Sequence, residues 1–135
     1  MMIAFLLGWI CVAAIAASAT VPLGFRIVEK RRAAPDSQPI RLHVALGTAT
    51  VILAFTHTLA ALTNLGSSEA IGGGFVALMA GGVAFLIIMA HVGIGLQLRD
   101  VRLRDRVRKR RMHVATASTI VLVTALHVWL LRAGQ

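Results

Sequence analysis

The sequence RLHVALGTATVILAFTH at residues 41–57 recurs in diverged form, 70 positions later, as RMHVATASTIVLVTALH at residues 111–127. Each copy begins with arginine, has histidine at its third and last positions, and is otherwise apolar or small. Similarity at a fixed offset is the signature of a duplicated structural unit. We therefore expect a tandem repeat of two helical hairpins, whose second helices carry these stretches and run in the same direction.

The composition of the 135-residue chain is that of a membrane protein. Hydrophobic residues make up 58% and charged residues only 14%, yet the formal net charge is +9. Soluble domains usually have about 45–50% apolar and about 25% charged residues. One cysteine, Cys11, excludes an internal disulfide, and aromatic residues at 5% are too few for a nucleic-acid stacking surface.

Four stretches reach the roughly 20 apolar residues that a spanning helix needs. Helices are expected because lipid offers no water to satisfy free backbone groups. The sequence thus predicts an all-α fold, an integral membrane four-helix bundle that forms a single domain over residues 1–135. The predicted spans cover about residues 2–25, 42–64, 71–98 and 112–131.

The distribution of lysine and arginine predicts the orientation. Five basic residues lie between the first two spans and eight lie within residues 99–111, whereas the middle loop Leu65–Ala70 has none and contains Glu69. By the positive-inside rule both basic loops are cytoplasmic, so both termini and the middle loop lie outside. The first span is expected to be retained rather than cleaved, because basic residues follow it and none precedes it. The stretch at residues 99–111 allows the third helix to continue beyond the membrane.

Four of the five histidines lie in the repeat, two on each of its helices, 14 residues apart. At about 1.5 Å per residue this spacing is roughly 21 Å along the axis, and fourteen steps of about 100° fall about 40° short of four turns. A left-handed supercoil removes that drift. If the two helices face each other, His43 pairs with His113 near the cytoplasmic face, and His57 pairs with His127 near the outer face.

Two opposed imidazoles fit the axial coordination of haem iron. Zinc or copper needs three or four ligands, commonly spaced at i+3 or i+4, and none of these histidines has such a neighbour. No Cys-x-x-Cys-His motif is present, which excludes covalently attached c-type haem. The alternative is that the histidines only make hydrogen bonds between helices. Matched depth in a repeat favours ligands, because polar groups in lipid are costly and usually functional.

The doubled His-x13-His pattern resembles the dihaem four-helix core of cytochrome b in quinol-oxidising complexes. It is also similar to the membrane core of ferric reductases and NADPH oxidases. The resemblance covers mainly Arg41–Thr58 and Arg111–Val128. It implies two haem b groups stacked across the membrane, one held by each histidine pair. Those larger proteins add further helices or a flavin domain, which this sequence lacks, so its electron donor and acceptor are expected to be separate.

Other residues have candidate roles at these sites. Arg41, Arg111 and Arg132 could bind haem propionates, or extend to the membrane interface as lipid-anchoring side chains. His91 on the third span is a candidate alternative ligand of the inner haem, a residue for quinone or proton chemistry, or a contact between helices. Glycines on the same span admit two explanations, close approach of a haem or ordinary helix packing: Gly81, Gly82, Gly93 and Gly95.

The leading functional hypothesis is transmembrane electron transfer between a quinone pool or redox partner subunit on one side and an acceptor or donor on the other. One alternative is a membrane oxidoreductase that acts directly on quinone, superoxide or ferric chelates, but no catalytic arrangement is recognisable. Another is a non-redox assembly or transport protein. We expect an electron-transfer subunit rather than a self-sufficient enzyme, in contact with lipid but not nucleic acid, in a bacterial inner membrane.

Overall fold

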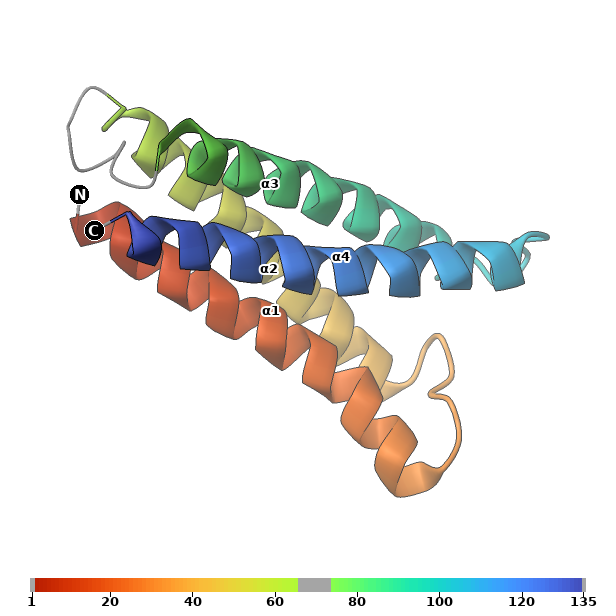
Figure 1. Ribbon diagram of the computed structural model, residues 1–135. Helices are drawn as coiled ribbons and strands as arrows, with labels where there is room; N and C mark the ends of the chain where they lie inside the picture. Colours follow the sequence, from red (N-terminus) through yellow and green to blue (C-terminus); the bar gives the residue numbers. More distant parts are fainter. Residues whose placement is uncertain (1, 66–73, 135) are drawn as a thin grey trace.

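The computed structural model describes residues 2–65 and 74–134, and these residues form four helices and no strand (Figure 1). The helices are α1 (Met2–Glu29), α2 (Gln38–Leu62), α3 (Gly74–Gln97) and α4 (Arg106–Ala133). Each is long and apolar enough to cross a membrane. The predicted all-helical architecture with four spanning helices is confirmed. Glu69 and the predicted start of the third span at residues 71–73 lie outside the described residues.

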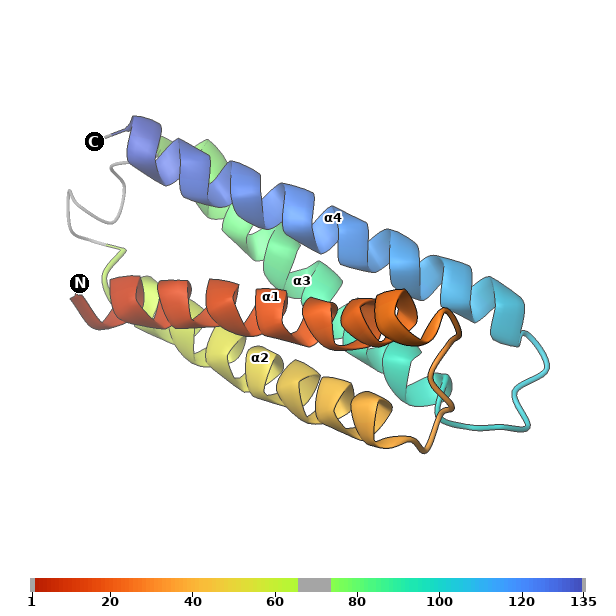
Figure 2. The ribbon, with the colours of Figure 1, turned by 90° about the horizontal axis from the view of Figure 1, so that it is seen from below.

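The helices form two antiparallel hairpins. Helix α1 packs along α2, and α3 packs along α4, while contacts between the hairpins run mainly from α2 to α3. Within the described chain, α2 and α4 have no close backbone approach and so occupy diagonal positions. Both run toward the end of the molecule that carries the two termini, and the hairpins cross at an angle (Figures 1 and 2). The two repeated helices therefore face each other across the interior.

The boundaries of the helices differ from the predicted spans at the basic end. Helix α3 ends at Gln97, so the basic stretch does not prolong it; instead α4 begins at Arg106, before its predicted span. The Arg106 guanidinium donates to the carbonyl oxygens of Leu98 and Asp100, at 2.8 and 2.9 Å. Carbonyl groups at a helix C-terminus lack partners within the helix, and a basic side chain satisfies them.

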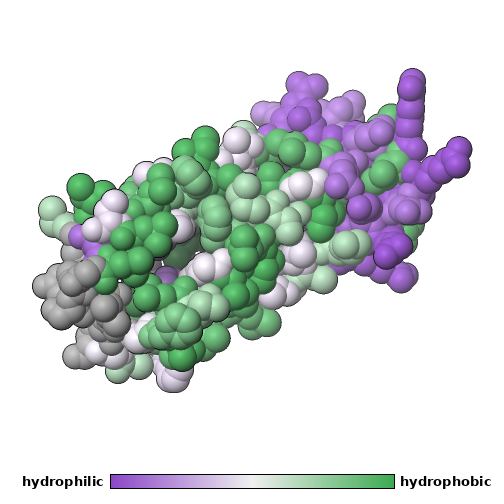
Figure 3. Space-filling model, turned by 90° about the horizontal axis from the view of Figure 1, so that it is seen from above, coloured by the Kyte–Doolittle hydropathy of each residue, from purple (hydrophilic) through white to green (hydrophobic). Residues whose placement is uncertain are grey.

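The interior consists mainly of alanines and isoleucines, and many large apolar side chains point outward. The buried residues include Ala54, Ala77, Ala80 and Ala84, whereas Phe75 is 72% and Leu86 67% exposed. Apolar residues cover most of the surface, and hydrophilic ones gather at one end (Figure 3). An exposed apolar surface of this extent is that of helices in contact with lipid.

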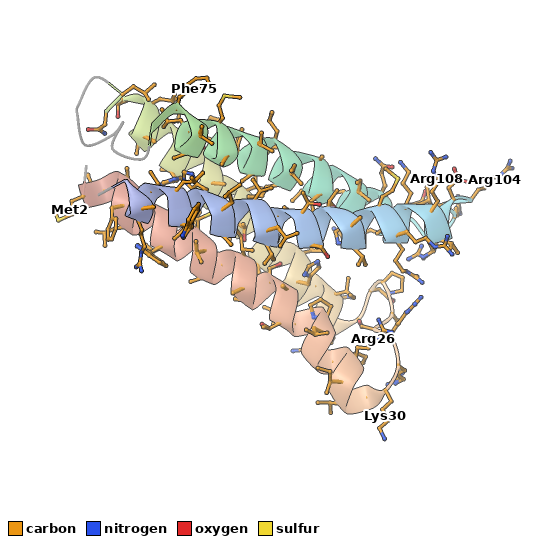
Figure 4. The ribbon with its side chains drawn as sticks, viewed as in Figure 1. Met2, Arg26, Lys30, Phe75, Arg104 and Arg108 are labelled. Carbon is orange, nitrogen blue, oxygen red and sulfur yellow. The ribbon has the colours of Figure 1, made fainter. Side chains whose placement is uncertain are left out.

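Charge and chain ends are segregated along the bundle. Met2 and Phe75 lie at one end, whereas Arg26, Lys30, Arg104 and Arg108 lie at the other (Figure 4). We call these the terminal end and the basic end of the molecule.

Candidate histidine-pair site

The structure brings the four repeated histidines together in two pairs across the interior. His57 of α2 and His127 of α4, the terminal-end pair, have ring centroids 6.5 Å apart and planes at 73°. His43 and His113, the basic-end pair, have centroids 6.0 Å apart and planes at 88°. The pairing proposed from the 14-residue spacing is thus the pairing observed. It arises because α2 and α4 are parallel and diagonal, so that residues at equal depth face each other.

Hydrogen bonds to main-chain carbonyls fix the orientation of three of these rings. Nδ1 of His57 lies 2.9 Å from the Ala4 oxygen, and Nδ1 of His127 lies 2.8 Å from the Ala77 oxygen. Nδ1 of His43 lies 2.8 Å from the Ser18 oxygen. A carbonyl oxygen only accepts, so Nδ1 carries the proton and donates it. The lone pair of each neutral ring then lies on Nε2.

Carbonyl acceptors of this kind are the usual outer partners of metal-bound histidine. A donated Nδ1–H fixes the tautomer and the orientation of the ring and makes the free nitrogen a stronger ligand. The acceptors come from α1 for the histidines of α2, and from α3 for His127 of α4. Each of these three histidines is therefore oriented by the other helix of its own hairpin.

Glycines of α1 and α3 lie directly against the histidine rings. A Cβ added to Gly81 would come within 2.9 Å of His127 Cε1, and one added to Gly8 or Gly95 within 3.1 Å of Cε1 of His57 or His113. By contrast, added Cβ atoms at Gly82 and Gly93 meet no atom of the described chain within 4 Å. Within α3, Gly81 and Gly95 thus make room for a histidine, whereas Gly82 and Gly93 do not.

The basic-end pair has a third histidine beside it. His91 of α3 stacks on His113 with centroids 3.8 Å apart and planes at 15°. Its Nδ1 lies 2.8 Å from the Thr116 hydroxyl oxygen, which itself donates to the His113 carbonyl oxygen at 3.0 Å. Because that hydroxyl proton is used, the Thr116 oxygen accepts from His91 Nδ1–H.

Both pairs fit the coordination of one iron by two imidazoles. With an imidazole–metal bond of about 2.0 Å and a nitrogen about 1.2 Å from its ring centroid, two opposed ligands have centroids about 6.4 Å apart. The observed 6.0 and 6.5 Å lie on either side of that value. His91 and His113, parallel at 3.8 Å, are too close to be opposed ligands of one iron. The donor chemistry fits a bis-histidine haem at each pair, and carbonyl anchors at three of the four histidines and glycine spaces at three of them agree with it.

A three-histidine group at the basic end could also hold a metal ion. One ligand atom each of His43, His91 and His113 lies within 4.8 Å of the others. The sequence argument against zinc or copper considered neighbours on one helix and so missed a third ligand from α3. However, the parallel stack of His91 on His113 does not direct both nitrogens to one point, and a ring would have to rotate for an ion to bind.

The arginines considered as propionate partners are at the ends of the bundle. Arg41 Nε donates to the Asp36 carbonyl oxygen at 2.9 Å, and Arg111 is exposed two residues before His113. The Arg132 guanidinium lies over the Trp9 ring, 5.2 Å from its centroid, in a cation–π contact.

Several residues of the site were not found from the sequence. The main-chain carbonyls of Ala4, Ser18 and Ala77, which accept hydrogen bonds from the histidines, cannot be recognised from the types of these residues. A signal was present in Gly81 and Gly95, because their separation equals that of His113 and His127 in the next helix. Helices packed as a hairpin bring equal spacings into register, so glycine and histidine meet twice.

Comparison with known proteins adds no assignment. No protein-family model, curated protein or solved structure matches this chain.

Proposed function

We propose that this chain is a dihaem b-type membrane cytochrome that carries electrons across the membrane. The observation that supports it best is the pair of opposed imidazoles, found twice, at the separation that one iron between them requires. Haem b, when bound, supplies a one-electron ferric/ferrous couple. Two ligands per iron leave no open position, which favours electron transfer over binding of oxygen.

The chain's own residues hold and insulate the two centres. His57 and His127 bind at the terminal end, and His43 and His113 bind at the basic end. The carbonyls of α1 and α3 keep Nε2 of the anchored rings unprotonated and directed away from the neighbouring helix. The helix segments between the pairs consist mainly of apolar and small residues, and the hydroxyl of the buried Thr50 bonds a carbonyl of its own helix. The roughly 21 Å between pairs spans most of an apolar layer about 30 Å thick.

The finer architecture belongs to the same proposal. The matching contacts of the two hairpins support a duplicated hairpin, with α2 and α4 as equivalent helices. The basic end is placed in the cytoplasm by the positive-inside rule, with both termini outside, in a bacterial inner membrane. Cysteines introduced as Lys30→Cys or Arg104→Cys in a Cys11→Ser background should react with an impermeant reagent only from the cytoplasmic side. Labelling from outside would reverse the orientation.

Partners are proposed from the same reasoning. A quinone pool or a separate redox subunit supplies or accepts electrons at each face. Direct oxidoreductase activity has less support, because the hydroxyls of Thr56 and Thr58 near the terminal-end pair each bond a carbonyl of their own helix. Turnover of a quinol by the isolated chain would favour that alternative.

The decisive experiment is haem analysis of the purified full chain. We expect a reduced-minus-oxidised spectrum of the b type and two haems per chain by pyridine haemochrome. A Thr56→Val variant is the matched control for substitution of a paired histidine. Thr56 is exposed, is adjacent to His57, and its hydroxyl bonds only its own helix. A colourless wild-type protein that cannot be reconstituted with haem would overturn the proposal.

A second candidate is supported by the three-histidine group at the basic end. If the haem-free chain bound one zinc ion per molecule through His43, His91 and His113, a metal-binding transport or assembly role would be favoured. Isothermal titration of colourless protein with zinc, repeated on His91→Ala, measures this directly. The terminal-end pair has two imidazoles only and should not contribute.

A further inference from the structure

One histidine of the four lacks the support that the other three have. Among the described residues, His113 Nδ1 is buried and has no hydrogen-bond partner. His43, His57 and His127 each donate Nδ1–H to a main-chain carbonyl of the preceding helix. A buried polar group without a partner costs free energy, so its presence at one of four equivalent positions needs an explanation.

The register of the hairpins identifies the residue that occupies the missing position. On α1 the acceptors for His57 and His43 are Ala4 and Ser18, which are 14 residues apart like the histidines themselves. On α3 the acceptor for His127 is Ala77, and 14 residues later is His91. The carbonyl at the equivalent position is therefore that of His91, which interacts with the His113 ring without making a full hydrogen bond, and the side chain of the same residue stacks on that ring.

We propose that His91 is a positioning residue for His113, and that the stacking of its ring supplies the orientation that a full hydrogen bond to a main-chain carbonyl gives the other three histidines. This inference rests on the proposed function, in which His113 is an axial ligand. The stack at 3.8 Å and 15° fixes the plane of the His113 ring. Gly95 leaves room for that ring, since an added Cβ would lie 3.1 Å from its Cε1.

Thr116 connects His91 to the turn of α4 that carries His113. Its hydroxyl accepts the His91 Nδ1–H at 2.8 Å and donates to the main-chain oxygen of His113 at 3.0 Å. A single hydroxyl thus connects the positioning ring to the backbone of the residue that it positions. The basic-end haem consequently has one ligand held by a carbonyl and one held by a ring, whereas the terminal-end haem has two held by carbonyls.

The test uses variants that keep or remove the flat ring. His91→Phe keeps a stacking face without a nitrogen, and His91→Ala removes it; Thr116→Val removes the hydroxyl that fastens it. Each is made in the full chain and in a His127→Ala background, which retains the basic-end haem alone. The readout is the electron paramagnetic resonance spectrum of the ferric protein, because its g values report the relative planes of the two imidazoles, together with haem count and midpoint potential.

We expect His91→Ala to retain both haems, to shift the g values and midpoint potential of the basic-end haem, and to leave the terminal-end haem unchanged. His91→Phe should restore most of the wild-type signal, and Thr116→Val should give a smaller shift in the same direction. Unchanged spectra in His91→Ala would overturn the inference. Equal loss of the basic-end haem in the Ala and Phe variants would also overturn it, because His91 would then be a ligand itself.

The inference about His91 can be tested even if the proposed haem-binding function is wrong. If the wild-type chain binds no haem, the histidine ring signals of the haem-free protein still decide the inference by nuclear magnetic resonance. A stacked His91 shifts the His113 ring protons by its ring current, so His91→Ala should move them and His91→Phe should move them back. His113 protons that are the same in all three proteins would contradict the stack.

Discussion

The two ends of the bundle each carry a pair of histidines at a similar separation, but the rings are supported differently. At the terminal end, His57 and His127 each donate to a carbonyl and each lie against a glycine, Gly8 or Gly81. At the basic end, His43 is held by Ser18, whereas His113 is held by a stacked ring. The comparison teaches that two hairpins can place histidines at matching depths and yet orient them by different means.

The largest expected effect is the loss of one of the two proposed haems. His127→Ala removes a ligand from the terminal-end pair only, so haem per chain should fall from two to one, with the basic-end signal retained. His43→Ala should remove the other haem. Pyridine haemochrome with optical redox titration measures both variants. If either substitution removed both haems equally, the two ends would not be independent, and the comparison would fail.

The part of this architecture that could be predicted follows from the period of single helices and from the recurrence of one stretch of sequence in two of them. Hydropathy located four spans, and a 14-residue spacing placed His43 and His57 on one face, which the structure bears out by pairing them with His113 and His127. Period and depth are properties of a single helix and can be counted from its sequence.

The other contacts between helices could not be predicted in the same way. The stack of His91 on His113 depends on the rotation of α3 against α4, which no pattern within α3 specifies. The carbonyl anchors are equally hidden, because every residue has a carbonyl. The start of α4 at Arg106 was missed because hydropathy detects the apolar segment and not the polar turns before it.

The next largest effect is expected when an added methyl group fills the space that a glycine leaves for a histidine ring. Gly81→Ala places a Cβ 2.9 Å from His127 Cε1, whereas Gly82→Ala, next to it, meets no described atom within 4 Å. Both variants gain the helix propensity of alanine, up to about 1 kcal/mol, so their difference isolates the clash. Overpacking typically costs about 1–3 kcal/mol, or roughly five- to hundredfold in haem affinity at the terminal end.

Haem retention during dilution, measured for each end by its own optical band, checks this prediction. Equal retention in Gly81→Ala and Gly82→Ala would mean that the ring moves away at no cost. The same comparison at the basic end uses Gly95→Ala with Gly93→Ala as its control. A smaller loss is expected there, because the distance from the added Cβ to His113 is longer, at 3.1 Å.

The smallest effect is expected when the hydroxyl of Ser18 is removed and its main-chain carbonyl is kept. The Ser18 hydroxyl lies 3.1 Å from His43 Nδ1, and the Ser18 carbonyl lies nearer, at 2.8 Å. Ser18→Ala removes only the weaker partner, so the orientation of His43 should persist and haem content should stay at two. A neutral hydrogen bond contributes about 0.5–1.5 kcal/mol, and the remaining carbonyl bond should hold this change to the lower end of that range.

The matched control is Thr20→Val, because the Thr20 hydroxyl donates to the Ala17 oxygen of its own helix and not to a histidine. The measurement is the midpoint potential of the basic-end haem, which is sensitive to hydrogen bonding at the ligand. A small shift in Ser18→Ala and none in Thr20→Val would show that the carbonyl is the main anchor of His43. Loss of the basic-end haem in Ser18→Ala would instead assign that role to the hydroxyl, and the carbonyl contacts of His57 and His127 would then need another explanation.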